Sequence, residues 1–205
     1  MSATAVLAAL AYVLWVIGPW LNPGLDHVNG YVSELAARDQ PFSWLFRAGD
    51  LVAGTLAVAT AGMALAVRAR RPPLVTIGWL GLAVFGVATI VDSGLTPMTC
   101  APYVDTTCAL AERAGTLPLT HELHAATSSV AVGGAIAGMV GLSAVPGITR
   151  RHGPTLLKLE IGATVLTLAA MLLGAYTGVA QRVQVAGISA WLVVLAVAVW
   201  HGELA

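Results

Sequence analysis

The sequence predicts an all-α integral membrane protein, with six transmembrane helices in one bundle that forms a single domain over residues 1–205. Composition is the first indication, because 58% of the residues are hydrophobic and only 10% are charged, against roughly 25% in soluble domains. The second is a mean hydropathy of +0.83. The third is spacing, since uncharged stretches of about 20 residues, the length that crosses a bilayer, recur along the chain.

The gaps between charged residues define six spans in chain order. Residues 3–21 form the first, and they lack the basic start and the cleavage site of a signal peptide, so we expect a retained helix. The second begins near Phe42 and has its uncharged core at residues 51–67, between Asp50 and Arg68. The remaining spans are predicted at residues 72–91, 120–145, 155–179 and 183–200.

Basic residues indicate the orientation, because cytoplasmic loops retain Lys and Arg. They gather between the second and third spans and between the fourth and fifth: Arg68, Arg70, Arg71, Arg150, Arg151 and, just beyond, Lys158. Both termini are therefore predicted to be cytoplasmic, and the loop that holds the two cysteines faces outward. The formal net charge of zero gives no reason to expect a nucleic-acid partner.

Small residues fill the fourth span at positions 133–141 and allow close helix packing. Gly134 and Gly138 could form the face of a homo-oligomer or pack inside the bundle. Internal packing is the preferred interpretation, because a six-helix bundle has more internal than external contacts.

Chemistry-bearing residues concentrate between Asp92 and Ser129. Cys100 and Cys108 share the outward loop, which favours a disulfide bond over a redox or metal pair, since no CxxC spacing is present. His121 and His124 lie three residues apart on one helix face, where they could converge on a metal or a ligand, or simply bond to water and loops. With Asp92 they form a possible ligand set for a divalent ion such as zinc.

Carboxylates inside spans are costly unless they are paired, so they are functional candidates. Asp92 has no local partner, whereas Asp50 lies three residues after Arg47 and could form a structural pair with it. Lys158 and Glu160 are expected at the inner membrane interface. The rest of the membrane centre offers only small residues and Thr, which places a transporter last among the candidate functions.

The first outward loop, residues 21–41, is long enough to cover the mouth of the bundle. Ser33 could begin a short interfacial helix over residues 33–38 as its N-cap, with Glu34 in the first turn. A second interpretation, compatible with the first, is that His27, Ser33 and Glu34 fold over the mouth and complete a pocket with Asp92, His121 and His124. Arg182, between the fifth and sixth spans, could anchor a helix end or bind an anionic head group.

The chain resembles the bacterial "domain of unknown function 998" family of six-helix membrane proteins. The likeness rests on Ser33-Glu34-Leu35-Ala36-Ala37, on Trp44-Leu45-Phe46-Arg47-x-Gly49, and on Asp92 ahead of Pro97-Met98-Thr99-Cys100-Ala101-Pro102, Asp105-x-x-Cys108 and His121-x-x-His124. It implies six spans in a bacterial inner membrane and supplies no reaction. A weaker likeness to the metal hydrolases related to alkaline ceramidases uses Ser33, Asp92, His121 and His124, but the paired histidines of a late helix are missing.

Two functions are therefore expected as alternatives. The first is binding of a lipid head group or small polar ligand in an outward polar pocket. The second is a membrane-embedded, metal-dependent lipid hydrolase or transferase. The candidate site residues are His27, Ser33, Glu34, Asp50, Asp92, His121, His124 and Arg182.

Overall fold

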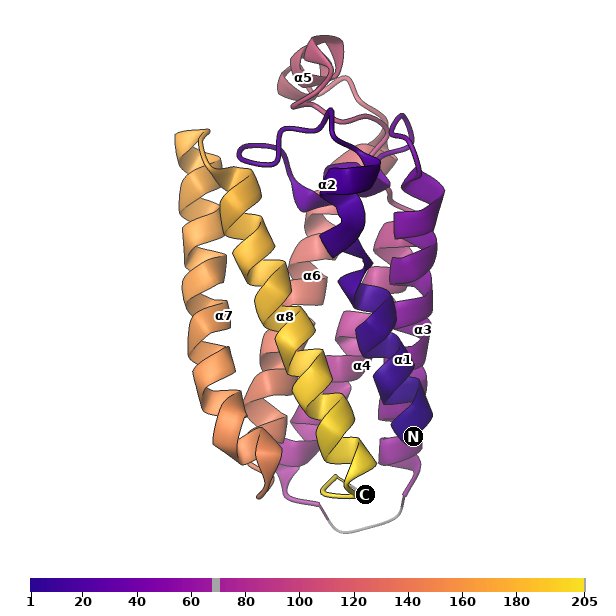
Figure 1. The fold of residues 1–205 in the computed structure, drawn as a ribbon, viewed down its shortest axis with the longest axis vertical. Helices are drawn as coiled ribbons and strands as arrows, with labels where there is room; N and C mark the ends of the chain where they lie inside the picture. The colour runs from indigo at the N-terminus through magenta and orange to yellow at the C-terminus, as the bar shows by residue number, and fades with distance from the viewer. Residues whose placement is uncertain (68–70, 205) are drawn as a thin grey trace.

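Six long helices run side by side in the computed structural model, which describes residues 1–67 and 71–204 (Figure 1). All six are long and apolar enough to cross a membrane. The predicted charges Arg68 and Arg70 lie outside the described residues. The first span joins α1 (Ser2–Tyr12), the 3-10 segment η1 (Val13–Ile17) and α2 (Gly18–Leu21). The others are α3 (Ser43–Ala66), α4 (Pro73–Gly94), α6 (Leu119–Leu142), α7 (Ile148–Leu173) and α8 (Thr177–Trp200).

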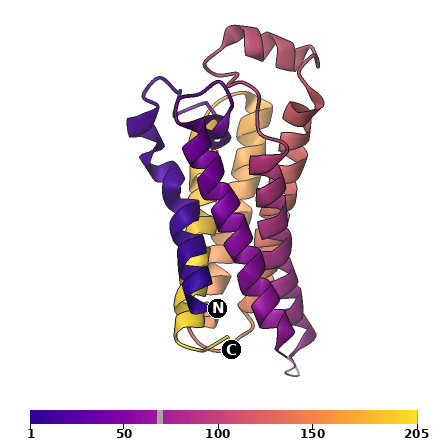
Figure 2. The same cartoon turned by 90° about the vertical axis from the view of Figure 1, so that its right-hand side faces the viewer.

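Both termini lie at one end of the bundle, here called the terminal end (Figure 1). The opposite end, here called the cysteine end, carries two covering segments, η2 (Val32–Ala36) and α5 (Thr106–Arg113). In Figure 2, α5 lies across the top of the bundle rather than along it. Asp105 begins α5 by accepting a hydrogen bond from the Thr107 N–H at 2.8 Å. The sequence reading missed this helix because it took residues 95–118 as a plain loop.

The predicted first four spans agree with the helices to within a few residues. The fifth was placed about six residues too late, and the sixth was predicted to begin about six residues late, although its end at Trp200 agrees. α7 begins directly after Gly147, whose φ of +119° favours glycine, and therefore includes Arg150 and Arg151 in its first turn. It ends at Gly174 in the left-handed conformation. Charges were read as loop markers, yet the helix ends are set by these two glycines.

The first span is interrupted in its middle, which the sequence reading did not anticipate. Pro19 has no N–H, so a regular helix could not form its bond to Trp15, and the chain tightens into η1 with the Gly18 N–H bonded to the Trp15 carbonyl. The break lets the end of the span bend across the cysteine end.

The tightest contact in the bundle joins α4 and α6, and it depends on facing glycines. A Cβ on Gly81 or on Gly141 would collide with backbone atoms of the opposite helix. Gly134 meets the Phe85 backbone of α4, and Gly138 meets the Trp191 ring of α8. The preferred interpretation of this stretch as internal packing is therefore confirmed.

Large side chains complete the core below these glycines, with Trp79, Phe85, Met139 and Trp191 all buried. The long helices neighbour one another in the order α1, α3, α4, α6, α7, α8 and back to α1. The α6/α7 pair is the loosest of these contacts. It closes at the terminal end, where Gly153 sits against Ser143.

Candidate functional site

Asp92, His124 and Ser128 form the centre of the site. Asp92 lies in the last turn of α4, and the other two lie one turn apart on α6, which the glycine contact holds close to α4. His124 Nδ1 is 3.0 Å from Asp92 Oδ1, although not aligned for a hydrogen bond. The Ser128 hydroxyl lies 3.2 Å from Asp92 Oδ2 and 3.4 Å from His124 Nε2. The predicted convergence of Asp92 with His124 is thus present.

Hydroxyl groups hold the Asp92 carboxylate in place. Thr127 donates a short hydrogen bond to Asp92 Oδ1, and its own oxygen lies 3.0 Å from the Thr96 hydroxyl. A carboxylate between α4 and α6 therefore has several donors in place of a cation, which offsets part of the cost of removing it from water.

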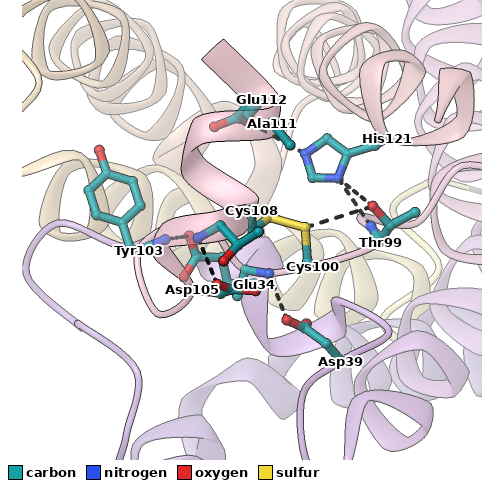
Figure 3. The surroundings of a disulfide bond; sticks show 12 residues. Glu34, Asp39, Thr99, Cys100, Tyr103, Asp105, Cys108, Ala111, Glu112 and His121 are labelled. Atoms are coloured by element: carbon teal, nitrogen blue, oxygen red, sulfur yellow. Dashed lines mark hydrogen bonds and ion pairs between the residues drawn. A yellow bond between two sulfur atoms is a disulfide. The ribbon is translucent and has the colours of Figure 1, made fainter. Parts of the chain in front are cut away.

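His121 joins α6 to the disulfide loop through Thr99 and Glu112 (Figure 3). Its Nδ1 accepts from the Thr99 N–H at 3.1 Å, so that nitrogen carries no proton, and its Nε2 lies 3.5 Å from Glu112 Oε1. The predicted Cys100–Cys108 disulfide is present directly beside this contact. His121 acts as a brace for the loop instead of joining His124.

The first loop covers the mouth through Glu34 and Ser33. Glu34 is completely buried, and its Oε1 accepts from the Tyr103 N–H at 3.2 Å (Figure 3). Burial raises the pKa of Glu34 to about 7. The hydrogen bond from Tyr103 lowers the pKa, but this effect is smaller than that of burial. The prediction of Ser33 as an N-cap is wrong, because η2 begins after Tyr31 and Ser33 lies within it, with its hydroxyl 3.4 Å from Met98 Sδ.

Arg182 holds the first loop to the bundle, so it is not free for a ligand. One guanidinium nitrogen donates to the carbonyls of His27, Gly30 and Gly178 at 2.9, 3.2 and 2.9 Å. The other donates to His27 Nδ1 at 3.1 Å, and burial followed by the Arg182 charge lowers the pKa of His27. Arg182 also lies inside α8 instead of in a connection, because the helix begins at Thr177.

Asp50 lines the same cavity as Asp92, and the expected pairing with Arg47 is absent. Within the described chain, the close ion contacts of carboxylates are those with His121 and His124, and the Arg47 Nε has no hydrogen-bond partner. The carboxylate is therefore part of the site, as its depth in the span suggested.

Two cavities meet at this cluster. The smaller, about 130 Å³, lies inside the bundle against Asp50 and Asp92, with Tyr12 and Thr89 in its wall. The larger, about 380 Å³, opens between α6 and α7. Both are lined by the same five residues, Ser33, Ser128, Val132, Gln181 and Gln184. The cavities are thus adjacent, with Ser128 on their shared wall.

The larger cavity has two chemically different sides. Its polar side comes mostly from α6 and from α5 above it: Glu112, His121, Glu122, His124, Ser128 and Ser129. Its α7 side presents Thr164, Thr167, Leu168 and Met171, of which Leu168 and Met171 are also exposed toward lipid. Such a cavity suits a molecule that has a polar end and an apolar chain.

The donors do not fit the expected metal set. Asp92 and His124 converge, but both nitrogens of His121 face the loop. Among the described residues, no group of three His, Cys, Asp or Glu side chains could hold a metal ion. A catalytic metal needs at least three protein ligands in most zinc enzymes, so we derive no metal-dependent step from this site.

Sequence reasoning missed a buried polar track between α7 and α8. Glu160 lies halfway along α7, is 0% exposed, and contacts Gly187, which leaves room for its carboxyl group. One turn further, Thr164 accepts from Gln184 Nε2 at 2.8 Å. The expectation that Glu160 is an interface residue is wrong, as is the view that only small residues and Thr occupy the membrane centre. The four-residue spacing of Glu160 and Thr164 was the available signal.

The fold and the site together define a polytopic helical membrane protein with an amphipathic cavity beside a half-buried Asp–His–Ser cluster. The chain belongs to the family described as "Protein of unknown function (DUF998)", whose model matches residues 5–198. No curated protein and no solved structure matches the chain, so the likeness to ceramidase-related hydrolases is without support.

Proposed function

We propose that this protein binds a membrane amphiphile, with the polar head at Asp92, His124 and Ser128 and the apolar chain against α7. The observation that carries the proposal is the larger cavity, which has a polar α6 side and an apolar side that continues onto the lipid-facing surface of α7. Its opening between two helices at bilayer depth supports access from the membrane.

The charges of the cavity favour a head group without negative charge. Carboxylates outnumber other charged groups around it, with Glu112, Glu122 and Asp92 near the polar side. Arg182 is already bonded to three carbonyls and a histidine, so it has little capacity left for a phosphate. Hydroxyl-rich or amine heads, such as the glycerol of a monoacylglycerol, can donate to these acceptors.

The test uses a monoacylglycerol that carries a photoactivatable diazirine and an alkyne in its acyl chain. Leu168→Trp should fill the larger cavity and lower cross-linking several-fold. Leu172→Trp is the matched control, because it makes the same change one turn along α7 at a residue that is 90% exposed. Equal cross-linking of both variants, or cross-links mapped away from α6 and α7, would contradict the proposal.

A further inference from the structure

Ser128 occupies the position of a nucleophile between the two cavities. Its hydroxyl lines both of them, and it lies one helical turn after His124. The next residue, Ser129, differs in its bonding, since its hydroxyl is used by the Ala125 carbonyl at 2.7 Å. Of the two neighbouring serines, Ser128 is the one with an imidazole beside it. Its hydroxyl donates to Asp92 Oδ2 at 3.2 Å, so it turns toward His124 Nε2 when it acts.

The two nitrogens of His124 face different partners, in the order that proton transfer requires. Nδ1 lies 3.0 Å from Asp92 Oδ1, without the alignment of a hydrogen bond, and Nε2 lies 3.4 Å from Ser128 Oγ. A carboxylate beside Nδ1 favours the tautomer with its proton on that nitrogen, which leaves Nε2 free to accept the serine proton. Contacts of this kind are often long without substrate and shorten when it binds.

A donor for a developing oxyanion is available on the same wall. Gln181 Oε1 accepts from the Val32 N–H at 2.6 Å, which fixes the amide of the side chain. Within the described part of the chain, the Gln181 Nε2 donates no hydrogen bond to protein, and Gln181, like Ser128, lines both cavities. Its N–H groups can therefore donate to a carbonyl oxygen bound there.

We propose that Ser128 is the nucleophile of an acyl-ester hydrolase, with His124 as general base and Asp92 orienting it; the substrate rests on the proposed function. Ser128 Oγ attacks the ester carbonyl carbon, and its proton passes to His124 Nε2. The bond from that carbon to the alcohol oxygen then breaks, and His124 protonates the departing glycerol. Water, deprotonated by His124, cleaves the acyl-serine, releases the fatty acid and restores the serine.

The test is labelling with an alkyl fluorophosphonate in native membranes. Its phosphorus bonds to an activated serine oxygen while fluoride leaves and His124 takes the proton. We expect a single adduct, on Ser128. Ser128→Ala should abolish it, and Ser143→Ala, which changes a hydroxyl at the other end of α6 and outside both cavities, should leave it unchanged. His124→Gln should slow labelling roughly 100-fold and remove its pH dependence.

Photo-cross-linking of the same variants with the monoacylglycerol separates the two proposals. An intact Cys100–Cys108 bond and an unchanged thermal midpoint in detergent show that a variant is folded. If Ser128 stays unlabelled while the wild type still cross-links, the hydrolase inference is overturned and amphiphile binding stands. If neither reagent reacts at α6, both proposals fail. Labelling that survives Ser128→Ala or is insensitive to His124→Gln also overturns the inference.

Discussion

The buried Glu34 makes the contact between η2 and the disulfide loop depend on pH. It lies on η2, receives the Tyr103 N–H from the disulfide loop and has an Oε2 atom without a hydrogen-bond partner among the described residues. A carboxyl group in that setting favours its neutral form. The contact between the two loops is therefore sensitive to pH near neutrality.

The first prediction at the residue scale concerns Glu34 and pH. Burial raises its pKa from 4.5 to about 7, so between these values the folded protein binds more protons than the unfolded chain. Raising the pH through that window should therefore lower the free energy of unfolding, by on the order of 2 kcal/mol, with no further loss above about pH 7.5. The measurement is the thermal midpoint in detergent from pH 4.5 to 8.

Glu34→Gln keeps the shape of the side chain and should flatten this part of the profile. Glu122→Gln is the control, because it makes the same change at an exposed carboxylate and should keep the wild-type slope. A midpoint that falls equally in the wild type and in Glu34→Gln would rule out Glu34 as the cause, and a wild-type midpoint that does not fall between pH 5 and 7 would contradict the prediction.

Helix pairs depend on residues whose importance is invisible in a hydropathy plot. α4 and α6 approach so closely that Gly81 faces the backbone of Gly138, and Gly78 faces that of Gly141. This packing sets the distance between Asp92 on α4 and His124 on α6. The geometry of the site is thus determined by glycines about three to five helical turns away.

The prediction at the element scale compares two glycines in long helices. Gly81→Ala should lower stability by about 1–3 kcal/mol, because its Cβ would meet backbone atoms that cannot move aside. Gly62→Ala, in α3, should be neutral or stabilising by up to about 1 kcal/mol, since no atom lies within 4 Å of its Cβ. Denaturation in mixed detergent micelles measures both. Equal stability of the two variants would contradict the close packing.

Hydropathy and charge spacing were sufficient to predict six helices. A bilayer requires long apolar segments whose backbone N–H and C=O groups are all hydrogen-bonded within the protein, and a helix meets that requirement. They failed where a charge lies inside a helix. Arg182 is accommodated within α8 by three carbonyls, and Glu160 is accommodated beside Gly187, so neither marks a helix end. Such compensation depends on tertiary contacts, which no local pattern contains.

The site was predicted in part for the same reason. Asp92 and His124 were grouped correctly because each lies at the same end of its helix. His121 was expected beside them, yet the direction of its side chain is set by Thr99 and Glu112 in a loop whose path the sequence did not reveal. Gln181 and Gln184 were missed because amides carry no charge and stand out little in an apolar span.

At the scale of the whole molecule, the two ends differ in the segments that cover them. The prediction is that Arg151→Cys reacts with a membrane-impermeant maleimide only after the membrane is opened, whereas Thr116→Cys reacts in intact cells. Both positions are exposed, and the native cysteines are bonded to each other, so each variant has one free thiol. The reversed pattern would place the disulfide loop in the cytoplasm.

Because α6 and α7 pack loosely, the lipid composition of the membrane controls how much of the cavity between them is occupied by ligand. A ligand that arrives between these helices is first dissolved in the bilayer, so its chemical potential there, and not its concentration in the buffer, sets the fraction bound. The fraction of protein that has bound ligand should then follow one curve at every total lipid concentration, when it is plotted against the moles of amphiphile per mole of total lipid. Added anionic phospholipid, whose head group the cavity disfavours, will dilute the ligand at constant volume and empty the cavity without competing for it.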